Sequence, residues 1–216
     1  MVWLLLATGF TGAYTLLFLG RSLHRYIASP PSVAVHFSPK GGCTDAVVRE
    51  LLAARHEVLV LAYSFTSKPI AQALVDAKLR GVKVDIVLDH SNEKEEYSDL
   101  HFFLEQGLVP VIDPHHAIAH NKVMIVDSRT ILTGSFNFTN QAEHENAENL
   151  LIIKGHPELI TSYRKDFAGH KGHARAAEVA AKPRPAAAPA APATATAPAR
   201  PAAAPAPAAH AHKQAA

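Results

Sequence analysis

His120 and Lys122 stand immediately before the apolar run VMIV, within the segment HNKVMIVDSRTILTGSFNFT that covers residues 120–139. On a β-strand successive side chains point to opposite faces, so residues two apart share a face. Two potentially cationic groups side by side repel each other and gain nothing from an apolar core behind them. This pair therefore predicts that an anion binds between His120 and Lys122.

The residues that follow are suited to chemistry at phosphorus. Four residues separate Lys122 from Asp127, six separate Asp127 from Gly134, and Ser135 and Asn137 come directly after. An imidazole can attack phosphorus without a metal and without deprotonation of a hydroxyl. The lysine supplies positive charge to the non-bridging oxygens, and the serine and asparagine add donors that stabilise developing charge. The glycine lets the backbone approach an anion closely.

A nucleophilic imidazole needs one free nitrogen and an acceptor that holds the proton on the other nitrogen. Glu148 is the preferred acceptor, because it leads directly into the apolar stretch NLLII. Glu143 and Glu145 compete for this role, but their surroundings are typical of a solvated acidic turn. Asp127 lies an odd number of residues from His120 and faces the other way on a regular strand, so we interpret it as architectural.

Several further histidines allow a second interpretation. His115 and His116 precede His120, and His170 and His173 lie in the stretch GHKGH, so a zinc site is conceivable. No cysteine or carboxylate spacing supports such a site. We therefore expect polar loops at these positions, with no metal ligand among the site residues.

The sequence before the motif alternates between strand and helix signals. Apolar runs predict strands over residues 32–38, 58–65 and 82–89, and helical spacing predicts helices over 44–55, 68–81 and 98–107. Thr44 is placed to cap the first helix, and Asn137 could cap a helix in NQAEHENA. The second half predicts strands with short connections and a last helix over 156–170. The expected fold is α/β, with a mixed, largely parallel sheet flanked by helices in one domain.

Both ends of the chain differ from this domain, which we place at residues 32–170. Residues 2–20 carry no charge and are long enough to cross a bilayer, so residues 1–28 are predicted to be a membrane anchor or a signal sequence. Residues 176–216 are almost entirely Ala and Pro and are predicted to be a disordered tail with an unknown partner.

Charge and cysteine content exclude some classes of protein. The formal net charge of +2 comes from the tail, since residues 1–175 alone sum to −1. The domain is not strongly basic, so any polyanion must be held by a local groove. The single cysteine, Cys43, excludes an internal disulfide and a Cys-rich zinc site.

The spacing around His120 resembles the HKD signature of the phospholipase D superfamily, and the chain is similar to its short single-motif bacterial nucleases. The stretches FSPKGG (37–42), LAYSFTSKPIAQALVDAKLRGVKVDIVLD (61–89) and GSFNFTNQAEHENAENLLII (134–153) carry the same resemblance. Animal members that include mitochondrial cardiolipin hydrolase and the piRNA-pathway nuclease are also similar.

The resemblance implies a phospholipase D-like fold and an active site built from two motifs. Because this chain has one motif, it implies a homodimer with the site on the two-fold axis. His120 of one subunit would form a phosphohistidine, and His120 of the other would act as general acid and then base. Lys122, Ser135 and Asn137 would bind the phosphate, and Glu148 would orient the histidine. No cofactor and no metal are implied.

These observations predict a non-specific endonuclease that cleaves single- or double-stranded DNA, or RNA, without a metal. A phospholipase D-type hydrolase of a lipid such as cardiolipin and a non-catalytic nucleic-acid-binding module are the alternatives. The expected location is a bacterial inner membrane, anchored through residues 2–20, with the domain in the periplasm. Secretion after signal cleavage and the cytoplasmic face are the other possibilities.

Overall fold

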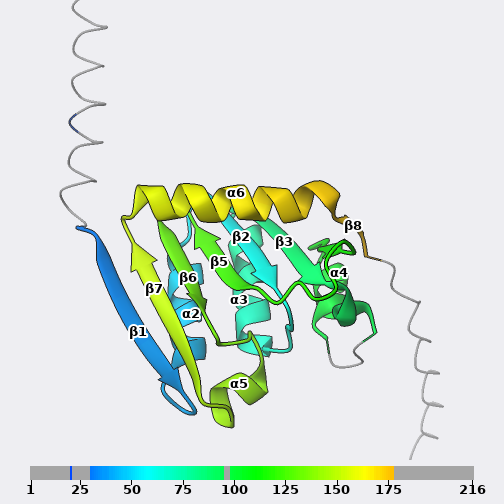
Figure 1. The fold of residues 1–216 in the computed structure, drawn as a ribbon, viewed down its shortest axis with the longest axis horizontal. Helices are drawn as coiled ribbons and strands as arrows, with labels where there is room; N and C mark the ends of the chain where they lie inside the picture. The colour runs from blue at the N-terminus through cyan, green and yellow to red at the C-terminus, as the bar shows by residue number, and fades with distance from the viewer. Residues whose placement is uncertain (1–19, 21–29, 95–97, 178–216) are drawn as a thin grey trace, which may run out of the picture. The chain divides into compact units, whose positions relative to one another are not determined.

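A computed structural model describes residue 20 and residues 30–94 and 98–177 of the chain (Figure 1). Eight strands form one sheet in the order β1-β7-β6-β5-β2-β3-β4-β8. The strands are β1 Ser32–Ser38, β2 Glu57–Ala62, β3 Lys83–Asp89, β4 Val111–Asp113, β5 Lys122–Val126, β6 Thr130–Gly134, β7 Glu148–Lys154 and β8 Arg175–Ala176. The helices are α2 Cys43–Ala53, α3 Lys68–Leu79, α4 Leu100–Glu105, α5 Asn140–His144 and α6 Pro157–His173, with a 3₁₀ turn, η1, at His90–Glu93.

The predicted mixed sheet flanked by helices is confirmed, but the sheet is not largely parallel. Only the β2–β3 and β3–β4 pairs are parallel, and the other five pairs are antiparallel. The strand–helix alternation was interpreted as continuous from residue 32, whereas β1 pairs with β7 at an edge and never contacts β2 in the ladder. Parallel pairing therefore belongs only to the segments joined through α3 and α4.

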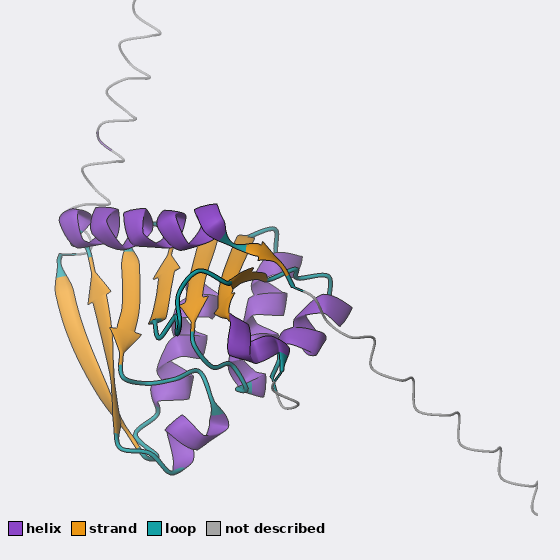
Figure 2. Cartoon of the chain, turned by 45° about the vertical axis from the view of Figure 1, so that its right-hand side comes forward, coloured by secondary structure: helices purple, strands orange, loops and turns teal. Residues whose placement is uncertain are grey.

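Helices cover the two faces of the sheet unequally (Figure 2). The larger core joins α2, α3 and α4 to one face and contains the fully buried Leu51, Leu74 and Phe103. The smaller core lies on the other face, where Phe167 of α6 packs on side chains such as Leu61 of β2. Figure 1 shows α6 crossing one end of the strands, which leaves their opposite ends free of that helix.

Two helix starts differ from the sequence prediction. Helix α2 begins at Cys43, and its first N–H groups are bound by a distant side chain: Glu143 accepts from Gly42 N at 3.1 Å and from Thr44 N at 2.7 Å. Glu143 is buried, so its assignment to a solvated turn was wrong. Helix α5 is capped by Thr139, which accepts a hydrogen bond from Ala142 N.

The predicted membrane location is corrected by the structure. No helix in the described part of the chain is long and apolar enough to cross a bilayer. The prediction depended on residues 2–20, and all of these except Gly20 lie outside the described residues. Residues 178–216, most of the predicted tail, lie outside them as well. The described fold extends past residue 170, because β8 pairs with β4.

Asp127 ties the end of β5 to the start of β2. Its carboxylate accepts hydrogen bonds from the backbone N–H groups of Arg55, His56 and Glu57, at 2.9, 2.7 and 3.0 Å. Its own N–H donates to Glu57 O at 2.9 Å. Asp127 has φ +52°, a left-handed conformation that Asp tolerates better than most residues. These bonds fix the position of β5 along β2.

Asp127→Ala is expected to lower the free energy of unfolding by about 2 kcal/mol, because three N–H groups lose a charged acceptor. Urea denaturation measures the change. Asp76→Ala is the matched control, since Asp76 makes a single side-chain bond to Gln72 on a helix surface, and it is expected to cost less than about 0.5 kcal/mol. Equal effects of the two substitutions would show that the Asp127 bonds do not stabilise the fold.

Candidate active site

The predicted site residues gather at the end of the sheet away from α6 (Figure 1). Strands β5 and β7 begin at this end of the sheet, with Lys122 and Glu148 as their first residues. Strand β6 ends there at Gly134, followed by Ser135. Antiparallel pairing sets Lys122 opposite Ala62 at the end of β2. Residues far apart in the sequence therefore meet because alternate strands start where their neighbours finish.

Lys122 is buried although it carries a charge. Only 7% of the surface of Lys122 is exposed to solvent. The ammonium donates a hydrogen bond to His120 O at 2.9 Å and lies 5.0 Å from the centre of the Tyr63 ring. Burial lowers the pKa of Lys122, and the nearby Glu148 carboxylate partly opposes that shift. The site thus holds a cation that is poorly solvated by water.

Tyr63 was missed by the sequence analysis. Its ring lies 4.6 Å from the His120 ring, centre to centre, so it contacts both motif residues. Tyr63 directly follows β2, and its N–H donates to Asn121 O at 2.9 Å. Asn92 anchors the same residue by donating to Tyr63 O. The available signal was a tyrosine ending an apolar strand, but its role depends on the β2–β5 pairing.

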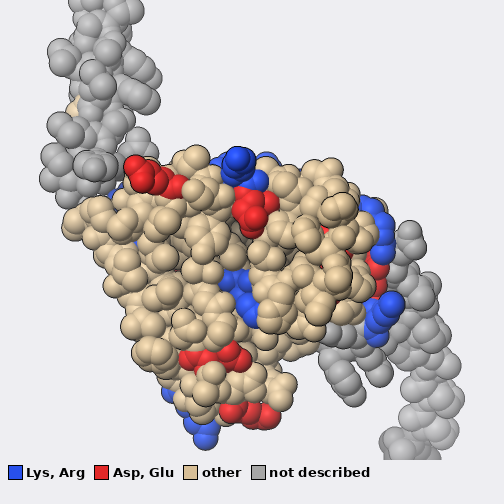
Figure 3. Space-filling view, in the orientation of Figure 1, with Lys and Arg blue, Asp and Glu red and all other residues tan. Residues whose placement is uncertain are grey.

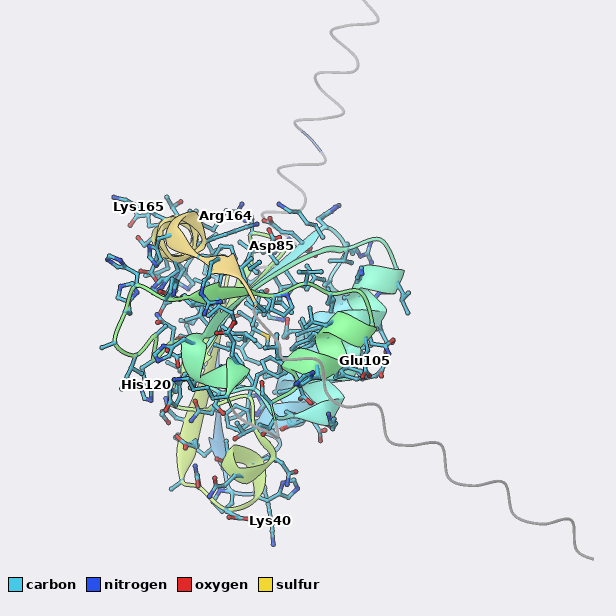
Figure 4. All side chains as sticks on the ribbon, turned by 90° about the vertical axis from the view of Figure 1, so that its right-hand side faces the viewer. Lys40, Asp85, Glu105, His120, Arg164 and Lys165 are labelled. Carbon is cyan, nitrogen blue, oxygen red and sulfur yellow. The ribbon has the colours of Figure 1, made fainter. Side chains whose placement is uncertain are left out.

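His120 is exposed, and it lies just before β5, not within the strand. In Figure 4 it lies at the surface, between Lys165 on α6 and Lys40 at the opposite end of the domain. Its imidazole makes no hydrogen bond to any residue that the structure describes. Both ring nitrogens are therefore available to groups outside this part of the chain.

Gly134 and Ser135 hold the end of β6 against β7. Gly134 has φ +150°, and a Cβ there would lie 2.2 Å from Asn149 O, so the close approach that requires glycine is to a neighbouring strand. Ser135 N donates to Asn149 O, and Asn149 N donates to Ser135 Oγ, both at 3.1 Å. The hydroxyl proton of Ser135 remains available as a donor.

Asn137 lies between two buried aromatic side chains, Phe136 and Phe138. Its side-chain Oδ1 is buried and has no hydrogen-bond partner among the described residues. A buried carbonyl oxygen without a donor is costly, so the position calls for a partner that this part of the chain does not supply. Asn137 does not cap α5, because Thr139 does.

Glu148 is half-buried and accepts a hydrogen bond from Asn146 Nδ2 at 3.0 Å. Asn146 O in turn accepts from Ser38 Oγ at 3.0 Å, which links the ends of β7 and β1. Glu148 is close enough to Lys122 to affect its pKa, but it is not hydrogen-bonded to His120 within the described chain. The structure therefore joins His120, Lys122 and Tyr63 directly, and Glu148 to them only electrostatically.

Charges are sparse on the face shown in Figure 3. Basic and acidic side chains form small separate groups there, and no continuous basic area covers the described surface in this view. An anion at this site would be held by individual groups such as the Lys122 ammonium and the Ser135 hydroxyl. An exposed imidazole and a buried ammonium that share one aromatic neighbour, Tyr63, are suited to nucleophilic attack on an anionic ester.

Sequence comparisons agree with this geometry. The family model described as cardiolipin synthase, PLD-like domain, matches residues 47–171. A phospholipase D from Rickettsia bellii is 40% identical over 143 residues, which cover 66% of this chain and 71% of that protein. The human mitochondrial cardiolipin hydrolase is 34% identical over 121 residues, covering 56% of this chain and 48% of that protein.

Solved structures give the same result. Nuc from Salmonella typhimurium, a phospholipase D family member, aligns with a TM-score of 0.65 and 37% identity over 68% of this chain and 98% of that one. NucT from Helicobacter pylori aligns with a TM-score of 0.63 at 21% identity, which supports the fold alone. The chain therefore belongs to the phospholipase D superfamily, and its class of activity is that of a phosphodiester hydrolase.

Proposed function

We propose that the protein is a non-specific endonuclease that hydrolyses phosphodiesters in single- or double-stranded DNA, or in RNA, with His120 as nucleophile. The observation that carries this proposal is that the exposed His120 imidazole and the buried Lys122 ammonium both lie against the Tyr63 ring. The resemblance to short single-motif nucleases favours nucleic acid as the substrate. The sequence contains no motif that reads bases, which suits recognition of the backbone alone.

The proposed active unit is a homodimer with the site at its two-fold axis. Each chain supplies one histidine–lysine pair, whereas the reaction needs both a nucleophile and a proton donor. The His120 imidazole has no acceptor within the described residues, and Asn137 Oδ1 has no donor. A second copy would bring a second His120 and a second Lys122 into one cleft. Light scattering should then give twice the mass of one chain.

In the proposed reaction a His120 nitrogen attacks phosphorus, and the bond from phosphorus to the leaving oxygen breaks. The leaving oxygen takes a proton from the second His120, so the first product departs as an alcohol. Water then attacks the phosphohistidine and gives its proton to the second His120. The phosphorus–nitrogen bond breaks, and a phosphate monoester leaves. No metal takes part in these steps.

The remaining site residues stabilise charge in this scheme. Lys122, Ser135 and Asn137 would bind the non-bridging oxygens, through the ammonium, the hydroxyl and the side-chain amide N–H groups. Glu148 would hold the proton on the second nitrogen of the His120 imidazole once two chains join. Its present acceptance of a hydrogen bond from Asn146 shows that the carboxylate already has one oxygen engaged.

A phospholipid phosphodiester such as cardiolipin is the second candidate substrate. It is favoured by exposed apolar side chains on β1, where Val33, Val35 and Phe37 are 60%, 47% and 61% exposed. Phe37 lies opposite Asn149, the residue that is hydrogen-bonded to Ser135. Relatives named phospholipase D and mitochondrial cardiolipin hydrolase agree with this alternative. Both substrates offer the same chemistry, so only cleavage assays separate them.

His120→Ala is expected to reduce cleavage of a labelled single-stranded DNA by at least about 10⁴-fold, since both nucleophile and proton donor are lost. Cleavage by the parent should persist in EDTA at any temperature below the melting temperature of the EDTA-treated protein. Quenching the reaction with alkali should trap a phosphohistidine. His144→Ala, an exposed histidine on α5, is the control and should cleave normally.

Three outcomes separate the candidates in that assay. A parent that cleaves the phosphodiester of cardiolipin in vesicles but does not cleave DNA would indicate a phospholipase D-type hydrolase in place of the nuclease. A parent that binds DNA and cleaves neither substrate would indicate a non-catalytic binding module. Cleavage that survives His120→Ala would exclude the proposed nucleophile.

The alkaline limb of the pH–rate profile should begin below the pH expected for an ordinary lysine. Burial lowers the pKa of Lys122, so its positive charge, and with it kcat/KM, is lost as the pH rises through that lowered value. Lys122→Arg keeps the charge and should move the limb to higher pH, whatever its maximal rate. Lys165→Arg, on the exposed surface of α6, should leave the profile unchanged. An identical limb in parent and Lys122→Arg would contradict this assignment.

A further inference from the structure

Residues 114–121 connect β4 to β5, and His120 lies near the β5 end of this loop. At the β4 end, three histidines converge on one carboxylate oxygen. Asp113 ends β4, His116 follows it in the loop, and His170 and His173 lie in the last turn of α6. Asp113 Oδ2 is 2.9 Å from His116 Nδ1, 2.5 Å from His170 Nδ1 and 3.2 Å from His173 Nε2. The four ligand-type atoms all lie within 4.8 Å of one another.

Hydrogen bonding accounts for two of the three histidines, since His116 Nδ1 and His170 Nδ1 are both bonded to Asp113 Oδ2, but it leaves His173 unsatisfied. Asp113 is fully buried and His170 is 9% exposed, whereas the His116 and His173 side chains are 44% and 32% exposed, so the cluster runs from the interior to the surface. His173 Nε2 is buried and lacks an aligned hydrogen bond, although it is only 3.2 Å from the carboxylate oxygen. Protonated histidines this close would repel one another, and the cluster offers one carboxylate to three rings.

A small outward movement of the rings would give this cluster the spacing of a tetrahedral ion site. With ligands about 2.0–2.1 Å from zinc, neighbouring ligand atoms are separated by roughly 3.3 Å. The 3.2 Å between Asp113 Oδ2 and His173 Nε2 is close to this value. The 2.9 and 2.5 Å separations from His116 and His170 are hydrogen-bond distances, which would widen by several tenths of an ångström around an ion. The two helix histidines are three residues apart and therefore share one face of α6. Asp113 Oδ1 accepts from His115 N at 2.8 Å, which orients the carboxylate and leaves Oδ2 toward the rings.

The surroundings provide an outer shell and a path for an ion. His170 Nε2 lies 3.9 Å from Asp166 Oδ2, so a carboxylate stands behind the ring nitrogen that does not face Asp113. Such a partner behind a metal-bound histidine fixes its tautomer and raises its basicity. An open cavity of about 580 Å³ adjoins the cluster and is lined by His116, His170, His173 and Asp166, among others.

We propose that Asp113, His116, His170 and His173 bind one Zn²⁺ ion. Three imidazoles and one carboxylate suit zinc and exclude a preference for Mg²⁺ or Ca²⁺, which favour oxygen ligands. Four protein ligands form a closed site, as in structural zinc centres, so the ion takes no part in the hydrolysis.

The proposed ion joins the catalytic loop to α6. His116 precedes His120 by four residues in the same loop, and Ala119 N is already held by Asp89 Oδ2 at 2.7 Å. Zinc would tie the start of this loop to a helix 54 residues further along the chain. The expectation of polar loops holds for His116 but is wrong for His170 and His173, which lie in α6. The spacing of the histidines in the sequence does not reveal the carboxylate, Asp113, that the fold brings to them.

The test uses the full chain, purified without a polyhistidine tag. Elemental analysis after incubation with Zn²⁺ and desalting should give about one zinc per chain. Zinc at 100 times its Kd should raise the melting temperature by about 5–10 °C over the EDTA-treated protein. Co²⁺ in its place should give the intense visible absorption of a tetrahedral ion. None of these readouts depends on cleavage activity.

His116→Ala tests the ligand set, because this side chain is 44% exposed and its loss should not prevent folding. Zinc affinity should fall by more than about 100-fold, since a lost ligand costs more than a lost outer-shell partner. His115→Ala is the matched control and should bind zinc like the parent. Zinc bound equally by parent and His116→Ala, or by neither, would overturn the proposal.

Discussion

The site depends on the way β5 is fixed between β2 and β6. At one end, Asp127 binds three consecutive N–H groups at the start of β2 and sets where β5 lies along that strand. At the other end, the same register brings Lys122 opposite Ala62, so that Tyr63 reaches both motif side chains. A shift of β5 by one residue would turn Lys122 to the other face of the sheet. Asp127 at one end of this five-residue strand thus fixes the register that places His120 and Lys122 at the other end.

Burying the Lys122 ammonium has a cost that an anionic substrate can offset. The charge is compensated by the His120 carbonyl oxygen, the face of Tyr63 and the more distant Glu148. None of these is a full counter-charge in direct contact, so the site retains an unsatisfied attraction for a phosphodiester. A poorly hydrated ammonium loses little water when the substrate binds. Its attraction for the phosphodiester oxygens can therefore increase as negative charge develops on them during the reaction.

Local spacing was sufficient to find the motif but not its surroundings. His120 and Lys122 could be predicted because residues two apart near the start of a strand have a fixed relation. The contacts of Tyr63, the Glu143 cap on α2 and the Asp113 cluster each depend on segments at least 50 residues apart in the chain. The mixed sheet was predicted, whereas the proportion of parallel strands was not, because spacing within β1 does not reveal that its partner is β7.

The two edges of the sheet are unequal. One edge is β8, a strand of two residues, and the other is β1, a strand of seven residues without proline or lysine. Strand β1 has a row of backbone groups that no described strand pairs, and it presents Val33, Val35 and Phe37 to its surroundings. Natural sheets usually protect such edges with charge, proline or short length. Addition of a foreign extended segment, and any amyloid-like misassembly of this domain, would therefore begin at β1.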